Sequence, residues 1–447
     1  MPTEEYTHAP EILQHCRNIG AQFDLYDQAL FSTEVTGLEW DDAAKRWIIR
    51  TDRGDKMRAK YIAMGTGPLH RPKLPGIDGI NDFDGHAFHT SRWDYEYTGG
   101  DPGGARMENL ADKRVGIIGT GATAVQAVPE LAKIVKELYV FQRTPSSIDV
   151  RDQRATTQEE IETWSKEPGW SHARRERLAK ISSGRTALKG NDDYLSGKVE
   201  HFKEKKQHTT ELSQEEMIQK QLNSNFRIME QIRARVDAIV KDPKTAEALK
   251  PYYPYGCKRP VFHDEYLPVF NEPHVTLVDT APRGVARINE GGVVHEGTEY
   301  PLDVLIYATG FQWMATSTFN MITGRGGKTL QGKWAEEGTK AYLGSHSEGF
   351  PNLFVMSCPQ GGGGQFNFVR TIEAHSDYVV WMLETLRGKG ADIVDVKKEP
   401  ENIYADHCRD ADIVTQPLRD CISYYNGHGE GDPGSLAYYG GAAKWHE

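Results

Sequence analysis

The stretch Arg114 to Gln126, RVGIIGTGATAVQ, constrains the fold of this 447-residue chain more than any other. Its apolar, β-branched start is typical of a buried parallel strand, and AVQAVPELAKIV continues as a helix. Between them a loop matches G-x-G-x-x-A, where the first glycine allows the turn, the second admits a pyrophosphate, and the small third residue packs helix on strand. The loop residues are Gly119, Thr120, Gly121, Ala122, Thr123 and Ala124. Because a second strand, ELYVFQRT, follows, we expect a dinucleotide-binding β-α-β unit rather than an ordinary glycine turn.

The end of that second strand indicates which dinucleotide binds. Enzymes for NAD carry Asp or Glu there, about 20 residues on, to hold the ribose hydroxyls. This chain has Gln142, Arg143 and Thr144 instead. A carboxylate would repel a 2′-phosphate, whereas a guanidinium and a hydroxyl bind one through charge-assisted hydrogen bonds. The sequence therefore predicts NADPH, and the alternative is that Arg143 is a solvated loop charge.

Composition excludes several classes of protein. The formal net charge is −11, so we expect no nucleic-acid partner. No apolar run approaches the roughly 18 residues of a membrane span, and the start MPTEEYTHAP lacks the features of a signal peptide. We therefore expect a cytoplasmic protein without a membrane span. The five cysteines lack C-x-x-C spacing, so no metal site is expected.

Two separate stretches share one pattern of short strands and turns that end in an apolar strand and a T-G turn. The later one closes on Ala308, Thr309 and Gly310, and the earlier one on Gly65, Thr66 and Gly67. This repetition predicts two dinucleotide-binding domains. Between the glycine loop and the later stretch, charged and amphipathic residues from about 155 to 248 predict an inserted helical subdomain.

The two expected domains differ in completeness. The residues before Gly65 contain no strand, glycine loop and helix of the kind seen at Gly119. They begin instead with a helix opened by Pro10, whose apolar face includes Ile12, Ile19 and Phe23. We therefore expect the first domain to lack its phosphate loop.

The segment FDGHAFHTSRWD, residues 83–94, carries a resemblance to a known family. It matches F-x-G-x-x-x-H-x-x-x-W-[PD], the fingerprint of Baeyer-Villiger monooxygenases. GTGATA, VFQRTP, GCKRPVF, YATGF and YLGSHSEGFPNLFVMSCP add to it, so the chain resembles this family from about Tyr6 almost to its end. The resemblance implies an α/β flavoprotein fold with two Rossmann-like dinucleotide-binding domains and a helical insert. The implied parts are an incomplete FAD domain (1–82), a linker (83–110), an NADPH domain with the insert (111–312) and a return to the FAD domain and substrate region (313–447).

Members of the family use NADPH, FAD and O2 to insert one oxygen atom beside a ketone carbonyl, which gives an ester or lactone. Arg259 matches the active-site arginine, whose fixed charge would stabilise the attacking peroxide and the alkoxide. Lys258 matches the lysine that reads the 2′-phosphate with Arg143 and Thr144. By the same resemblance His89 serves the domain movements of the catalytic cycle. The alternatives are a solvated Lys-Arg pair and a metal pair of His86 and His89.

The resemblance also implies residues on the flavin side. Asn367 and Phe368 are expected near the isoalloxazine ring, although the glycines before them are equally typical of an ordinary loop. The two T-G turns are expected beside the cofactors. Because the flavin phosphate loop is lacking, we expect an incomplete FAD site, as in a truncated chain or a split gene.

The C-terminal NGHGEGDPGSLAYYGG is similar to the branch of the family that accepts bulky cyclic or steroid-like ketones, so a bulky small-molecule ketone is the expected substrate. Two other functions stay open at this point. One is a different flavin N- or S-monooxygenase, which the linker fingerprint argues against. The other is a non-catalytic NADP-binding remnant or subunit, which flavin content would distinguish. A hydrolase is disfavoured because no G-x-S-x-G is present.

Overall fold

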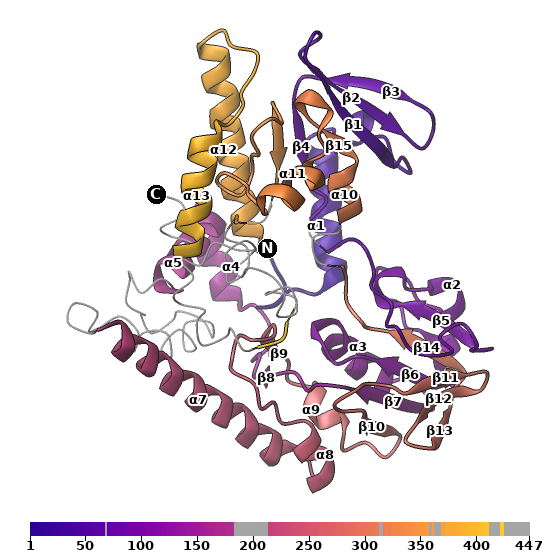
Figure 1. Ribbon diagram of the computed structural model, residues 1–447. Coiled ribbons are helices and arrows are strands. Elements are labelled where there is room, and N and C mark those ends of the chain that lie inside the picture. The colour runs from indigo at the N-terminus through magenta and orange to yellow at the C-terminus, as the bar shows by residue number, and fades with distance from the viewer. Residues whose placement is uncertain are drawn as a thin grey trace. The chain divides into compact units, whose positions relative to one another are not determined.

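The computed structural model describes residues 1–67, 69–182, 213–312, 316–356, 360–361, 368–410 and 421–423 (Figure 1). Two units divide these residues between them. Unit 1 takes its described residues from Met1–Gln28, Pro72–Trp170 and Lys220–Phe311. Unit 2 takes its own from Ala29–Arg71, Ser171–Gln219 and Gln312–Glu447. The division by cofactor drawn from the sequence, with boundaries at 82, 110 and 312, stays a prediction.

A sheet of five parallel strands forms the centre of unit 1 (Figure 1). Its order is β10 (Val275–Asp279), β7 (Glu137–Gln142), β6 (Arg114–Ile118), β14 (Val304–Tyr307) and β5 (His86–His89). The apolar residues of β6 and β14 are almost fully buried, as expected for parallel strands covered on both faces. The expected β-α-β unit is therefore present.

Helix α3 (Ala122–Ala132) follows the glycine loop and packs on this sheet through Val125, Val128 and Leu131, which are fully buried. A three-stranded antiparallel sheet precedes β14, as the sequence pattern predicted. Its strands are β11 (Arg287–Asn289), β12 (Gly292–His295) and β13 (Thr298–Pro301).

The remaining elements of this part of the chain are short or helical. They are η1 (Tyr26–Gln28), η2 (Thr90–Arg92), α2 (Tyr95–Thr98), η3 (Glu108–Leu110), β8 (Ile148–Asp149), α4 (Gln158–Ser165), α5 (Trp170–Ser182), α7 (Gln214–Ile239), α8 (Pro243–Ala248), β9 (Val261–Phe262) and α9 (Tyr266–Val269). The helices from α4 to α8 lie where the sequence predicted the helical insert.

Helix α1 (Ala9–Gln22) forms as predicted, with Pro10 in its first turn. Its apolar side chains are nevertheless solvent-exposed in the structure, with Ile12 51% and Phe23 63% accessible. Helical periodicity shows that a helix has an apolar side, but it does not show what that side packs against.

In unit 2 the earlier copy of the pattern folds as the later one does. An antiparallel meander is followed by β4 (Ile62–Met64), which pairs in parallel with β16 (Leu353–Val355). The meander consists of β1 (Val35–Asp41), β2 (Arg46–Thr51) and β3 (Lys56–Ala59), and β15 (Ile322–Thr323) pairs with β1. Trp47, which is fully buried, centres the core of this unit.

Helices complete the described part of unit 2. They are α10 (Thr316–Asn320), η4 (Arg325–Gly327), α11 (Leu330–Glu337), α12 (Phe368–Gly388) and α13 (Lys398–Asp410). The α/β architecture inferred from the sequence is therefore confirmed for the described residues, while the expected incompleteness of the flavin domain stays a prediction.

Candidate functional site

The predicted phosphate loop leaves its backbone open. Gly119 has a φ of 111°, and a Cβ there would meet the Ala308 carbonyl oxygen at 2.5 Å, so only glycine fits. Gly121 caps the start of α3, and a Cβ at Gly121 would find no atom within 4 Å. Free backbone N–H groups at the start of α3 therefore adjoin open space, which suits the pyrophosphate of a dinucleotide.

The loop is joined to the residues that follow β7. The Thr120 hydroxyl donates to the Thr144 carbonyl oxygen at 2.9 Å, and the Ser146 hydroxyl donates to the Thr120 carbonyl oxygen at 2.5 Å. These bonds hold Thr144 beside the glycine loop. Ser146 was not predicted from the sequence, because a serine after a strand carries no signal of its own.

Two cationic side chains predicted to read a 2′-phosphate are neighbours in the structure. Arg143 is exposed and makes no hydrogen bond or ion pair within the described part of the chain. Burial lowers the pKa of Lys258, and the charge of Arg143 lowers it further. The mutual repulsion of these cations would be relieved by a bound anion, so the residues fit the phosphate of NADPH.

Tyr253 links the two segments that carry these cations. Its hydroxyl donates to the Pro145 carbonyl oxygen at 3.0 Å and accepts from the Ser147 backbone N–H at 3.0 Å. Lys258 Nζ lies 5.6 Å from the centre of its ring. Burial raises the pKa of Tyr253 to about 12, so the hydroxyl keeps its proton at neutral pH.

Arg259, the predicted catalytic residue, lies at the exposed end of the same turn. The turn is also held from α7, since Asn225 donates to the Tyr255 carbonyl oxygen at 2.8 Å and accepts from the Tyr255 N–H at 2.7 Å. Burial raises the pKa of Tyr255, and the charge of Arg259 opposes that rise. The sequence contains no signal for the role of Asn225.

The family fingerprint forms β5 and the turn after it. His89 is buried, which lowers its pKa, and its Nδ1 accepts from the Ser91 backbone N–H at 3.2 Å. Its Nε2 lies 3.0 Å from the Gly310 carbonyl oxygen, so the neutral ring donates there. His89 thereby joins β5 to the T-G turn after β14, whose Thr309 hydroxyl donates to the Lys73 carbonyl oxygen at 2.5 Å.

Neighbouring residues of the fingerprint stabilise the same turn. Trp93 Nε1 donates to the Thr98 hydroxyl at 3.1 Å. His86 Nε2 lies 2.9 Å from Asp94 Oδ2, and its ring stacks on Tyr97 at 3.8 Å. His86 and His89 thus take part in separate bonds rather than in a shared metal site, and no group of three or more His, Cys, Asp or Glu in the described residues could hold a metal ion.

The flavin-side residues lie in unit 2. Gly65, Thr66 and Gly67 follow β4, and a Cβ at either glycine would find no atom within 4 Å. His70 Nδ1 lies 3.1 Å from the Gly67 carbonyl oxygen. Phe368 begins α12 and is 37% exposed. Asn367 lies outside the described residues, so its expected place beside a flavin stays a prediction.

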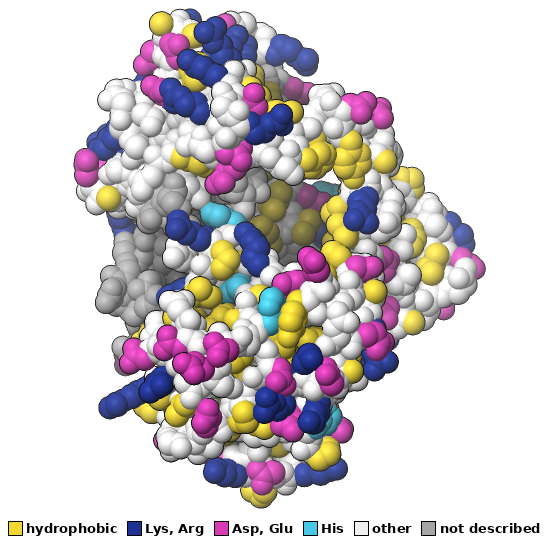
Figure 2. Space-filling view, turned by 90° about the vertical axis from the view of Figure 1, so that its right-hand side faces the viewer, with side chains coloured by type: hydrophobic (Ala, Val, Ile, Leu, Met, Phe, Trp, Pro, Cys, Tyr) yellow, Lys and Arg dark blue, Asp and Glu magenta, His cyan; other side chains and the backbone are white. Residues whose placement is uncertain are grey.

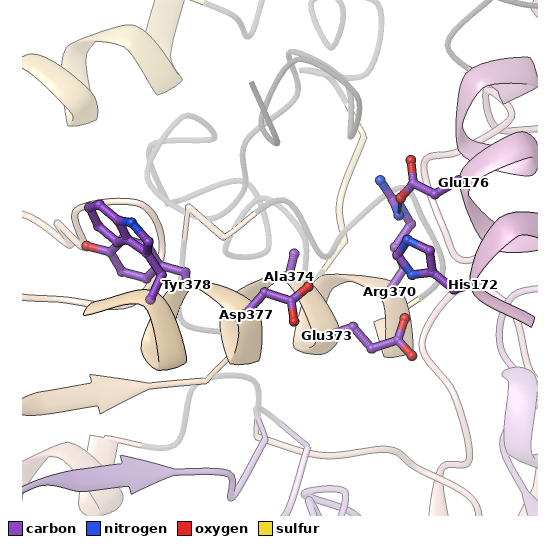
Figure 3. A pocket seen from close by; sticks show the side chains of 8 residues that line it. His172, Glu176, Arg370, Glu373, Ala374, Asp377 and Tyr378 are labelled. Carbon is purple, nitrogen blue, oxygen red and sulfur yellow. Dashed lines mark hydrogen bonds and ion pairs between the residues drawn. The ribbon is translucent and has the colours of Figure 1, made fainter. Parts of the chain in front are cut away.

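A pocket of about 350 Å³ opens between α5 and α12 of unit 2 (Figure 3). Two ion pairs cross it, Arg370 with Glu176 and Arg175 with Glu373, the latter at 2.5 Å. Tyr378, labelled at the other end of Figure 3, stacks on Trp381 at 5.9 Å between ring centres. The sequence did not predict this pocket, because its walls come from helices that are distant in the chain.

Charges of both signs are interspersed over the face shown in Figure 2, and hydrophobic side chains lie between them. Within the described ranges, no helix combines the length and the apolar character needed to cross a membrane.

Comparison with known proteins identifies the family. No protein-family model matches the chain. The Baeyer-Villiger monooxygenase ATR8 of Stachybotrys chlorohalonatus is 42% identical over 443 residues, which cover 97% of this chain and 69% of that protein. The solved polycyclic ketone monooxygenase of Thermothelomyces thermophila aligns with a TM-score of 0.90 and 35% identity over 100% of this chain and 76% of its own. The structure of OTEMO in complex with FAD and NADP aligns with a TM-score of 0.81 and 27% identity over 100% of this chain and 83% of its own. With this similarity beside the glycine loop, the paired cations and the fingerprint turn, the chain belongs to the Baeyer-Villiger monooxygenases.

Proposed function

We propose that the chain oxygenates a bulky polycyclic ketone to an ester or lactone, with NADPH held by unit 1 and Arg259 as the catalytic residue. The observation that carries the NADPH part is the pair of neighbouring cations, Arg143 and Lys258, beside Thr144 at the end of β7. A phosphate dianion there would satisfy both charges and accept from the hydroxyl.

The backbone around the glycine loop supports the rest of the dinucleotide. The open space at Gly121 adjoins the N-terminus of α3, where unsatisfied N–H groups favour an anion. His89 and Thr309 hold the T-G turn that follows β14, at the carboxyl edge of the sheet. Ligands of open α/β sheets bind at this edge.

In this family FAD and NADPH, when bound, supply the electrons that activate O2. The contribution of the chain itself is a fixed positive charge beside the reacting carbonyl. Arg259 provides it, because a guanidinium stays protonated and stabilises negative charge that develops on the ketone oxygen. Asn225 and Tyr253 fix the turn that carries Arg259.

A polycyclic substrate is favoured by one relative in particular. The polycyclic ketone monooxygenase of Thermothelomyces thermophila aligns over 100% of this chain. The C-terminal residues that suggested a bulky ketone lie outside the described part, so the proposal rests on this similarity.

The test measures ketone-dependent oxidation of NADPH with added FAD and identifies the lactone by mass spectrometry, for a steroid ketone and for cyclohexanone. We expect turnover of the larger ketone. Arg259→Ala should bind NADP⁺ as before and lose about 10²- to 10³-fold in rate, because the developing charge is no longer stabilised. Arg106→Ala, at an exposed arginine beside Glu108, is the matched control.

Lactone formation by Arg259→Ala at the original rate would show that Arg259 is not catalytic. NADP⁺ binding without flavin uptake or turnover would favour the non-catalytic alternative, and turnover of cyclohexanone alone would contradict the substrate class.

A further inference from the structure

Tyr253 occupies a singular place between the two segments that carry the paired cations. Arg143 and Thr144 follow β7, and Lys258 lies in a turn that is distant in the sequence. The Tyr253 hydroxyl meets the first segment, and its ring faces the Lys258 ammonium.

We propose that Tyr253 is a positioning residue for the 2′-phosphate of NADPH, which keeps Lys258 and the Arg143–Thr144 segment at phosphate-binding distance from each other. This inference rests on the proposed function, in which Arg143, Thr144 and Lys258 bind that phosphate.

The hydroxyl has two partners that need it. Ser147 is almost fully buried, with 1% of its surface accessible, so its N–H requires an acceptor within the protein. Tyr253 supplies that acceptor and at the same time donates to the Pro145 carbonyl oxygen. Removal of the hydroxyl leaves the N–H unsatisfied, and the segment that begins at Arg143 would then shift to find another partner.

The ring has a separate task. Without a bound anion, Arg143 repels Lys258, and burial already disfavours the charged ammonium. The negative face of an aromatic ring attracts a cation within about 6 Å, so Tyr253 opposes the displacement of Lys258. A phenylalanine at this position would keep the ring and lose the hydroxyl, whereas a leucine would lose both.

The test uses the full chain and two small probes, 2′,5′-ADP and 5′-AMP, which differ by the 2′-phosphate. Their dissociation constants are measured by calorimetric titration. Tyr253→Phe should weaken 2′,5′-ADP about 3- to 10-fold, the effect of one lost hydrogen bond, and Tyr253→Leu should weaken it further. Binding of 5′-AMP should stay within about twofold, which also shows that each variant is folded.

Two variants serve as references. Tyr252→Phe removes a neighbouring hydroxyl that bonds to Glu247 and should change neither constant. Arg143→Ala should weaken 2′,5′-ADP about 10- to 100-fold and leave 5′-AMP unchanged, as for a lost bond to a charged group.

The outcomes separate this inference from the proposed function. If Arg143→Ala loses 2′,5′-ADP selectively while Tyr253→Phe binds it unchanged, Tyr253 has no positioning role. If Tyr253→Phe weakens both probes equally, its role is structural and the inference is wrong. If Arg143→Ala leaves both constants unchanged, the proposed 2′-phosphate site itself is wrong. Should Tyr253→Leu lose 5′-AMP as well, the comparison of Tyr253→Phe with Tyr252→Phe decides.

Discussion

Burial of single titratable groups makes the stability of this protein depend on pH. His346 is 6% exposed, and its Nε2 has no hydrogen-bond partner in the described structure. Its ring packs edge-on against Phe354 at 4.8 Å and Tyr378 at 5.4 Å. Burial lowers the pKa of His346 to about 4; the Leu353 carbonyl opposes this shift, and the neighbouring His375 adds to it.

The direction of the pH effect follows from that lowered pKa. Between about pH 6.5 and 4 the unfolded chain binds a proton on this histidine and the folded chain does not. The contribution to the free energy of unfolding is therefore complete above pH 6.5 and is lost as the pH falls toward 4, up to about 3 kcal/mol. Urea unfolding at pH 7.5 and 5 should show a smaller pH difference for His346→Phe than for the unchanged chain. His15→Phe, at an exposed position, should keep the full difference.

At the scale of elements, a buried ion pair connects α11 and α13. Lys333 Nζ lies 2.8 Å from Glu401 Oε2 and donates to the Glu348 carbonyl oxygen at 2.8 Å. Glu401 also accepts from the Ser347 hydroxyl at 2.9 Å. The two charged side chains are only 4% and 0% exposed, and their hydrogen bonds hold the two helices in a defined register.

We expect Lys333→Met to destabilise the protein by about 3–5 kcal/mol, because it leaves the Glu401 carboxylate buried without its cation. Adding Glu401→Gln removes that charge but keeps an acceptor for Ser347, so the double variant should recover most of the loss. Lys328→Ala breaks an exposed pair with Glu336 and should cost less than about 1 kcal/mol. Thermal or urea unfolding measures all three, and equal losses for Lys333→Met and the double variant would contradict this account.

At the scale of the whole molecule, each unit has a hydrophobic core of its own. The core of unit 1 surrounds β6, β14 and α3, and that of unit 2 surrounds Trp47 and β16. The residues proposed to hold NADPH all belong to unit 1. We therefore expect NADP⁺ to slow amide hydrogen exchange mainly in the segments 114–144 and 253–259, because binding stabilises the folded form of the region that it contacts.

Hydrogen–deuterium exchange with and without NADP⁺ checks this expectation, with the strands β1 to β3 of unit 2 as the internal reference. Equal protection of those strands would show that the proposed contacts describe the bound state incompletely. Arg143→Ala, measured at the same NADP⁺ concentration, should lose the protection in unit 1.

The sequence by itself determined the features that depend on neighbouring residues. The run from β6 through the glycine loop to β7 was predictable because strand, turn and helix each leave a local pattern of apolar and glycine residues. The two meanders that end in T-G turns were predictable for the same reason. Arg143 and Thr144 were found because they follow a recognisable strand, and Lys258 and Arg259 only through the family resemblance.

Only the tertiary structure decided which distant residues meet. The proximity of Lys258 to Arg143, the bonds of Tyr253 to Pro145 and Ser147, and the pocket between α5 and α12 join segments far apart in the chain. The exposure of the apolar side of α1 was likewise invisible in its periodicity. A residue's spacing from its neighbours sets its secondary structure, whereas its long-range partners depend on how whole elements pack, and no local pattern encodes that packing.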